Sequence, residues 1–177
     1  PETLQCGDQP VFIAGDANGL RPLEHEGEDE GGIAGLNAAT TAAGGELLRN
    51  RRRVPIQITF TDPNVCAVGK RLDELERGSF VVGEGDLGSQ GRAYLMDIRG
   101  GKIHLYADGK SGKILGAELA CSRGEHLAHL ISSIIHGGMT IEDALSLPYY
   151  HPTFEEVVKR AIRDCLEKVK GVEPKRG

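Results

Sequence analysis

Several features are scarce or missing in this 177-residue chain, and each absence excludes a class of protein. No apolar run approaches the roughly 18 residues that a membrane-spanning helix needs, and the chain does not open with a secretory signal peptide, so we expect no membrane partner. Tryptophan is absent and only 5% of the residues are aromatic, which argues against a core of large rings. The formal net charge of −5 gives no support to nucleic-acid binding.

Cysteines are few and lie far apart. The separations along the chain are 60, 55 and 44 residues for Cys6, Cys66, Cys121 and Cys165. No CxxC or other short pair is present, so we expect reduced thiols, a cytoplasmic location and no metal site. His126 and His129 are three residues apart and could share a metal ion. They lack the HExxH order in which a glutamate assists a zinc-bound water, so surface or partner-facing histidines are favoured.

Charge and composition change near residue 50. Residues 1–50 carry nine acidic and two basic side chains, and a stretch of small residues runs from Asn37 to Gly45. Three arginines follow at 51–53, and strand-like sequence comes after them. We therefore place a boundary between residues 1–50 and 51–177. The arginine run is typical of a solvated edge, and a nucleic-acid patch is the less favoured interpretation.

The first segment begins with a short apolar run that predicts a buried strand at 11–14, followed by Gly15 and Asp16. Pro22 and a series of acidic residues then predict the start of a helix, which three glycines weaken. An acid at the carboxyl end of a buried strand, before a glycine turn and a helix, can bind ribose or ribitol hydroxyls. Asp16 fits that pattern, but a plain turn into a helix would have the same sequence.

Strands and then helices are predicted after the boundary. Apolar or alternating runs predict strands at 55–60, 65–68, 80–82, 93–98, 103–107 and 114–120, with a short helix within 70–76. Capping-box patterns then mark three helix starts, at Ser122 with Glu125, Thr140 with Asp143, and Thr153 with Glu156. Strands joined by short turns and followed by helices predict an α+β domain, with an antiparallel sheet and flanking helices.

A glycine-rich motif at 83–88, GEGDLG, matches the GxGxxG fingerprint of dinucleotide sites. That fingerprint requires a helix whose N-terminus faces the pyrophosphate. Strand-like sequence follows instead, so a flexible hairpin loop is the favoured interpretation.

The segment around His151 is the most suggestive of chemistry. His151 lies between Pro148 and Pro152, just before a helix, so the backbone should hold the imidazole in place. Glu156, in the first helical turn, can accept a hydrogen bond from one ring nitrogen and leave the other nitrogen for proton transfer. A structural explanation is also open, since helix capping accounts for Glu156 and His151 can be an ordinary loop residue.

Together these segments resemble the C-terminal part of a flavoprotein disulfide reductase, most closely the dihydrolipoamide dehydrogenases. The motifs that carry the resemblance are VFIAGD at 11–16, LEH at 23–25, EDEG at 28–31, FTDP at 60–63, VG at 68–69, Asp108 with SGKILGA at 111–117, and HPT at 151–153 with Glu156. The resemblance implies that residues 1–50 end an FAD-binding domain and that residues 51–177 form the interface, or dimerisation, domain.

The resemblance also implies contacts with FAD. Asp16 would bind the ribitol chain, and Phe60 would lie close to the cofactor. The helix entered at Leu23, Glu24 and His25 would direct its N-terminus at the flavin pyrimidine ring, where amide groups stabilise negative charge on the reduced flavin. Glu24 stands where the family often has a small residue, and we expect its carboxylate to point outward.

In such a family, His151 would be the acid/base for a dithiol substrate, with Glu156 orienting it, and a homodimer would present the pair to the other subunit's active site. The His151–Pro152 bond is expected to be cis. The parent enzyme would oxidise dihydrolipoamide, free or on a lipoyl domain, and pass electrons through a redox disulfide and FAD to NAD.

The C-x₄-C pair, the glycine-rich FAD motif and the nicotinamide domain are not in this sequence, so we expect the chain alone to be inactive. Alternatives are a glutathione, trypanothione or mercuric reductase, a soluble transhydrogenase, or a non-enzymatic dimerisation module.

Overall fold

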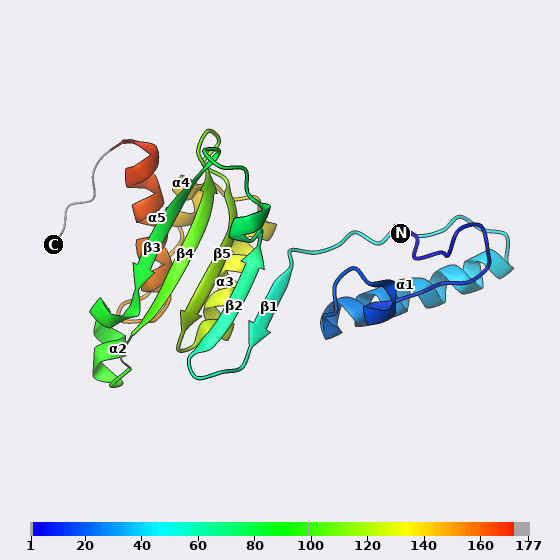
Figure 1. Ribbon diagram of the computed structural model, residues 1–177, viewed down its shortest axis with the longest axis horizontal. Helices are drawn as coiled ribbons and strands as arrows, with labels where there is room; N and C mark the ends of the chain where they lie inside the picture. Colours follow the sequence, from blue (N-terminus) through cyan, green and yellow to red (C-terminus); the bar gives the residue numbers. More distant parts are fainter. Residues whose placement is uncertain (1, 99, 172–177) are drawn as a thin grey trace. The chain divides into compact units, whose positions relative to one another are not determined.

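The computed structural model describes residues 2–98 and 100–171, and the chain divides into two compact units, residues 1–53 and 54–177 (Figure 1). The division falls close to the change in composition at residue 50. Whether the first unit is the end of an FAD-binding domain remains a prediction.

The first unit is built around one long helix. A 3-10 turn, η1 (Gly15–Asn18), precedes α1 (Glu24–Ala42), which begins close to where Pro22 and the acidic residues predicted a helix. The expected strand at 11–14 is wrong. The segment instead makes two backbone hydrogen bonds, to Leu4 and Cys6, around one isolated bridge between Gln5 and Phe12, a pairing too short to form a strand. Among the described helices, α1 included, none has the length and hydropathy of a membrane span.

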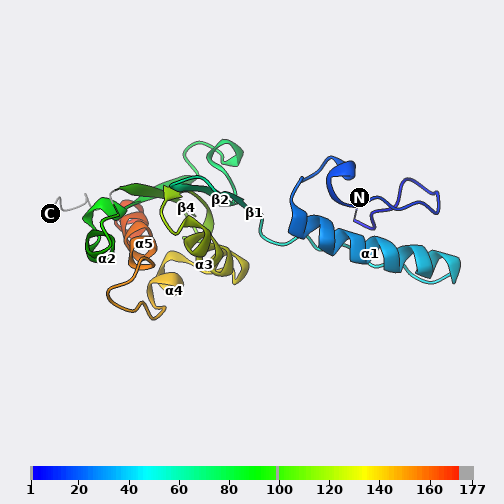
Figure 2. The same cartoon turned by 90° about the horizontal axis from the view of Figure 1, so that it is seen from below.

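The second unit contains a five-stranded antiparallel sheet in the order β1-β2-β5-β4-β3. Its strands are β1 (Ile56–Thr59), β2 (Asn64–Gly69), β3 (Phe80–Asp86), β4 (Gly101–Asp108) and β5 (Ile114–Cys121). The connections hold η2 (Leu72–Glu74), η3 (Leu87–Ser89) and α2 (Gly91–Leu95), and the last elements are α3 (Gly124–His136), α4 (Ile141–Leu145) and α5 (Glu156–Val169). Figure 2 shows α3, α4 and α5 on the same side of the sheet. The predicted α+β class is confirmed.

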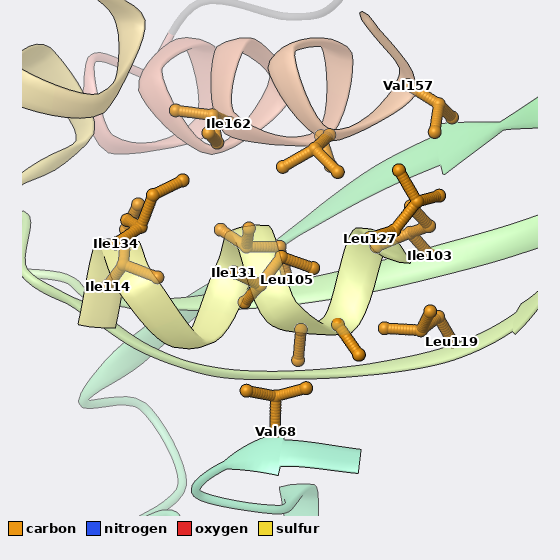
Figure 3. Packing of buried hydrophobic residues seen from close by; sticks show 14 of the residues in the cluster. Val68, Ile103, Leu105, Ile114, Leu119, Leu127, Ile131, Ile134, Val157 and Ile162 are labelled. Carbon is orange, nitrogen blue, oxygen red and sulfur yellow. The ribbon is translucent and has the colours of Figure 1, made fainter. Parts of the chain in front are cut away.

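The core fills the space between the sheet and its covering helices. Leu127, Ile131 and Ile134 of α3 lie between the sheet and α5 and are almost fully buried (Figure 3). Ile162 of α5 and Leu105 of β4 complete the contact from either side. Burying each of these side chains stabilises the fold by roughly 1.5–3 kcal/mol.

The glycine-rich motif lies at the contact between β3 and α5, and the expectation of a flexible hairpin loop is wrong. Residues 83–86 belong to β3 and pair with β4. A Cβ atom on Gly83 would lie 2.0 Å from the carbonyl oxygen of Ala161, and one on Gly85 would lie 2.6 Å from that of Val157. Alternate glycines therefore let the backbone of α5 rest directly on the backbone of the strand.

Side chains of α5 also bind the outer edge of β3. Asp164 Oδ2 accepts a hydrogen bond from the amide of Glu84 at 2.7 Å, and Lys168 Nζ donates to the carbonyl oxygen of Val82 at 2.7 Å. The two α5 side chains are themselves 2.8 Å apart. These contacts satisfy edge groups that could otherwise pair with another strand.

Two further local expectations are wrong. The segment predicted as a strand at 93–98 contains helix α2, because the side chain of Gln90 caps it by accepting a hydrogen bond from the amide of Ala93 at 2.8 Å. Ser122 does not cap α3, because the turn after β5 extends through Arg123, whose φ of 62° makes it the residue before the helix. By contrast, the capping box of Thr140 and Asp143 is complete.

Candidate functional site

The candidate site lies where the loop before α5 meets the first turn of that helix. His151 Nδ1 lies 3.0 Å from Oε1 and 3.1 Å from Oε2 of Glu156. A carboxylate can only accept, so Nδ1 carries the hydrogen and Nε2 is left to exchange a proton with a ligand. The histidine side chain is 79% exposed and the glutamate side chain 24%. The structure thus brings the two predicted residues together with the ring open to solvent.

Hydrogen bonds hold the loop on both sides of His151. Tyr149 Oη donates to the carbonyl oxygen of Ala144 at 3.1 Å, which ties the loop to α4. Thr153 Oγ1 donates to the carbonyl oxygen of Tyr150 at 2.9 Å. The peptide bond after His151 is cis, as the resemblance implied. The hydrogen bonds of Tyr149 and Thr153 hold the loop that carries the ring.

The surroundings of Glu156 favour its ionised form. Its pKa is lowered from the ordinary value mainly by the hydrogen bond from His151, although burial acts in the opposite direction. The amide of Thr153, 3.2 Å from Oε2, and the charge of Arg160 lower this pKa further. The predicted capping box is only half formed here, because the Thr153 hydroxyl turns to Tyr150 and Glu155 is the residue before the helix.

Gln90 lies buried beneath this pair and was not predicted from the sequence. Its Nε2 donates to the carbonyl oxygen of Thr153 and lies 3.5 Å from Glu156 Oε2. The side chain is among the most buried in the unit, with 1% of the residue exposed. The sequence holds no local signal for this contact, since Gln90 and Glu156 are 66 residues apart.

A pocket of about 560 Å³ borders the histidine loop. Its lining includes Arg92, Met96, Arg123, Tyr150, Pro152 and Phe154. Tyr150 and Pro152 are the direct neighbours of His151, so the loop adjoins a hollow of the size that small-molecule sites have.

Of the residues predicted to contact FAD, Asp16, Leu23, Glu24 and His25 lie in the first unit and Phe60 in the second. Asp16 is exposed in η1, and Glu24 and His25 are exposed at the start of α1, which follows Leu23. No side-chain hydrogen bond caps this end of α1, which leaves its first amides for other acceptors. An exposed carboxylate and an uncapped helix start fit the hydroxyls and the anionic ring of a flavin. Phe60 is 80% exposed after β1.

A buried charge cluster holds the turn that bears Asp16. Glu30 Oε2 accepts hydrogen bonds from the amide of Gly15 at 2.8 Å and from the side chain of Asn18. Arg52 binds Glu30 and also Glu26, the latter at 2.7 Å. These contacts join η1, α1 and the arginine run within the first unit. The sequence alone did not predict them.

The remaining histidines and cysteines do not converge. Among the residues that the structure describes, no three His, Cys, Asp or Glu side chains are placed to hold a metal ion. His129 Nδ1 lies 2.7 Å from the carbonyl oxygen of Glu125. Burial raises the pKa of the thiols to about 11 for Cys66 and about 12 for both Cys121 and Cys165, so they remain protonated.

Comparisons with known proteins agree with this fold. Residues 55–162 match the family described as pyridine nucleotide-disulphide oxidoreductase, dimerisation domain. Dihydrolipoyl dehydrogenase 3 of Haloarcula marismortui is 27% identical over 168 residues, which cover 94% of this chain and 34% of that protein. Dihydrolipoyl dehydrogenase of Haloferax volcanii is 31% identical over 159 residues, which cover 88% of this chain and 32% of that protein. The HOCl-induced flavoprotein disulfide reductase RclA of Escherichia coli aligns with a TM-score of 0.73 at 18% identity, covering 91% of this chain and 37% of that one. The chain spans about a third of the length of these relatives.

Proposed function

Because the chain belongs to the pyridine nucleotide-disulphide oxidoreductase family through its dimerisation domain, we propose that it is the C-terminal dimerisation region of a dihydrolipoamide dehydrogenase. The whole enzyme oxidises dihydrolipoamide, free or on a lipoyl domain, and reduces NAD. This region supplies the acid/base pair for the dithiol.

The observation that carries the proposal is the contact between His151 and Glu156. Glu156 binds Nδ1 at 3.0 Å and directs Nε2 toward the outside. Nε2 takes the proton of a substrate thiol, and the resulting thiolate attacks one sulfur of the parent enzyme's redox disulfide. The S–S bond breaks, a mixed disulfide forms, and the second substrate thiol then displaces the enzyme sulfur. The substrate leaves as a disulfide, and its two electrons remain on the enzyme's thiols.

FAD would be held in part by residues of this chain, and when bound it supplies the electron transfer from those thiols to NAD. Asp16 would accept hydrogen bonds from the ribitol hydroxyls. The first amides of α1, entered at Leu23, Glu24 and His25, would stabilise negative charge on the flavin ring.

The acid/base pair acts on the second subunit of a homodimer. Two observations support this arrangement, the 79% exposure of the His151 side chain and the membership of a dimerisation-domain family. The described cysteines of this chain's second unit are buried and protonated, so they offer no thiolate for the reaction. The chain by itself is therefore expected to be inactive.

The test is the substitution His151→Gln in a full-length protein that carries this region. Removal of a general acid/base lowers turnover by about 10²–10⁴-fold. We expect NAD reduction by dihydrolipoamide to fall in that range while the FAD absorbance that copurifies with the protein is unchanged. His136→Gln, at the exposed end of α3, is the matched control and should retain full turnover.

Equal turnover in His151→Gln and the unaltered protein would refute the acid/base role. The unaltered protein could instead turn over a different thiol/disulfide couple, such as glutathione and its disulfide, and not the lipoyl pair. That result would indicate one of the related reductases.

A further inference from the structure

Every hydrogen-bonding group of the buried Gln90 side chain points at a defined partner. A primary amide offers two N–H donors and one oxygen acceptor. The oxygen accepts from the amide of Ala93 at 2.8 Å, and Nε2 binds the carbonyl oxygen of Thr153 and faces Glu156 Oε2 at 3.5 Å. The side chain therefore links the start of α2 to the loop and helix that carry the acid/base pair.

Both oxygens of Glu156 lie near His151 Nδ1, and Oε2 faces two further donors. Oε2 faces the amide of Thr153 at 3.2 Å and the side-chain amide of Gln90. Oε1 makes the shorter of the two approaches to His151 Nδ1, at 3.0 Å. The Thr153 and Gln90 donors to Oε2 are neutral amides, so they orient the carboxylate without replacing the imidazole as its partner.

Gln90 can impose this orientation because its own backbone is fixed. Its amide donates to the carbonyl oxygen of Leu87 at 2.9 Å, and the Leu87 side chain is fully buried. Arg160 of α5 donates to the carbonyl oxygen and the hydroxyl of Ser89, at 3.1 Å and 3.0 Å. The segment before α2 is thus attached to α5 beside the residue that it orients.

We propose that Gln90 is the positioning residue of the acid/base pair, and that it selects the Nδ1–H tautomer of His151 by fixing the carboxylate of Glu156. The catalytic meaning of this role rests on the proposed function. The tautomer itself is a property of this chain and is measurable without any turnover.

The experiment records long-range ¹H–¹⁵N correlations of the His151 ring in the 177-residue chain, at about pH 8, where an ordinary imidazole is neutral. We expect the Nδ1–H form to dominate in the unaltered chain. Gln90→Met keeps the length of the side chain and removes the amide. The ratio of Nδ1–H to Nε2–H should then fall about tenfold, the size expected for the loss of one hydrogen bond to a charged group.

A second variant keeps the test valid if Gln90→Met fails to fold. Gln90→Asn retains an amide that can cap α2, since asparagine is a preferred residue before a helix, but its shorter side chain withdraws the amide from Glu156. The same fall in the tautomer ratio is expected. Gln57→Met, at an exposed glutamine of β1, is the matched control and should leave the ratio unchanged.

A folded Gln90 variant with the tautomer ratio of the unaltered chain would overturn the proposal, as would an unaltered chain in which Nε2–H dominates. These outcomes are independent of the turnover test. If His151→Gln keeps full turnover while the Gln90 variants change the tautomer, the proposed function fails and the positioning role stands.

Discussion

At the scale of single residues, neighbouring arginines have different surroundings. Arg52 binds Glu26 and Glu30, whose side chains are 8% and 3% exposed. Arg53 binds Asp29 in a pair whose side chains are 70% and 38% exposed. Removing the partner of a buried charge leaves that charge without compensation, whereas an exposed ion pair contributes little.

We therefore expect Arg52→Met to lower the free energy of unfolding of the first unit by about 2–3 kcal/mol, since the buried Glu30 loses its arginine partner while Glu26 keeps Arg21 at 3.1 Å. Arg53→Met should lower it by less than about 1 kcal/mol. Hydrogen exchange of the Gly15 amide, which donates to Glu30, measures both effects. Equal exchange rates in the two variants would show that the cluster does not hold the turn.

The sequence predicted contacts between residues that are close along the chain, and did not predict contacts between distant residues. The pairing of His151 with Glu156 follows from five residues of separation and a constrained loop. The contacts of Gln90 and of Arg52 span 66 and 22–26 residues, and they depend on how elements pack, which no local pattern records. The roles of Asp16, Leu23, Glu24, His25 and Phe60 remain predictions that rest on the resemblance.

At the scale of elements, the contact between β3 and α5 depends on the absence of side chains. Gly83 lies against the carbonyl of Ala161, and Gly85 lies against that of Val157. The obstruction at each position is backbone, so no side-chain rotation can relieve an added methyl group.

Gly83→Ala should therefore lower the free energy of unfolding by about 3 kcal/mol, the upper part of the range for overpacked cores. Gly91→Ala is the matched control, because a Cβ there meets nothing within 4 Å, and it should change stability by less than about 0.5 kcal/mol. Urea unfolding followed by circular dichroism gives both values. A Gly83→Ala variant as stable as the control would mean that α5 can move away from the strand at little cost.

Element prediction succeeded where periodicity ran through a buried face and failed where tertiary contacts decide. The alternation in β1 reflects burial on one side of the strand. The glycines of β3 have no such signal, because a residue without a side chain fits a turn and a close-packed strand equally well. At 93–98 the apolar content suggested a strand, but the cap from Gln90 favours a helix.

At the scale of the whole molecule, large apolar side chains remain exposed on the second unit. Tyr94 and Leu95 of α2 are 84% and 70% exposed, and Tyr150, beside the acid/base histidine, is 82% exposed. Met96, which follows α2, and Tyr150 line the same pocket, and apolar surface gathered in this way commonly marks an interaction site.

We expect the 177-residue chain to form dimers at high micromolar concentration, because burial of this apolar surface favours association. Sedimentation equilibrium measures the dimerisation constant. Tyr94→Ser combined with Leu95→Ser should weaken association by at least about tenfold, since about 1.5–3 kcal/mol is lost for each large apolar side chain left unburied. Leu72→Ser, at an exposed leucine of η2, serves as the control. A clean monomer for the unaltered chain would count against the dimeric arrangement.

The close approach of α5 to β3 also bears on how this domain can change in evolution. The distance of α5 from the sheet is limited by contact between main chains at Gly83 and Gly85. Substitutions elsewhere in the core can accumulate with little change in the distance between α5 and the sheet, provided that the two glycines are kept. The position of the first turn of α5 would then be preserved. Distantly related proteins could keep the same placement of Glu156 after most of their sequence had diverged.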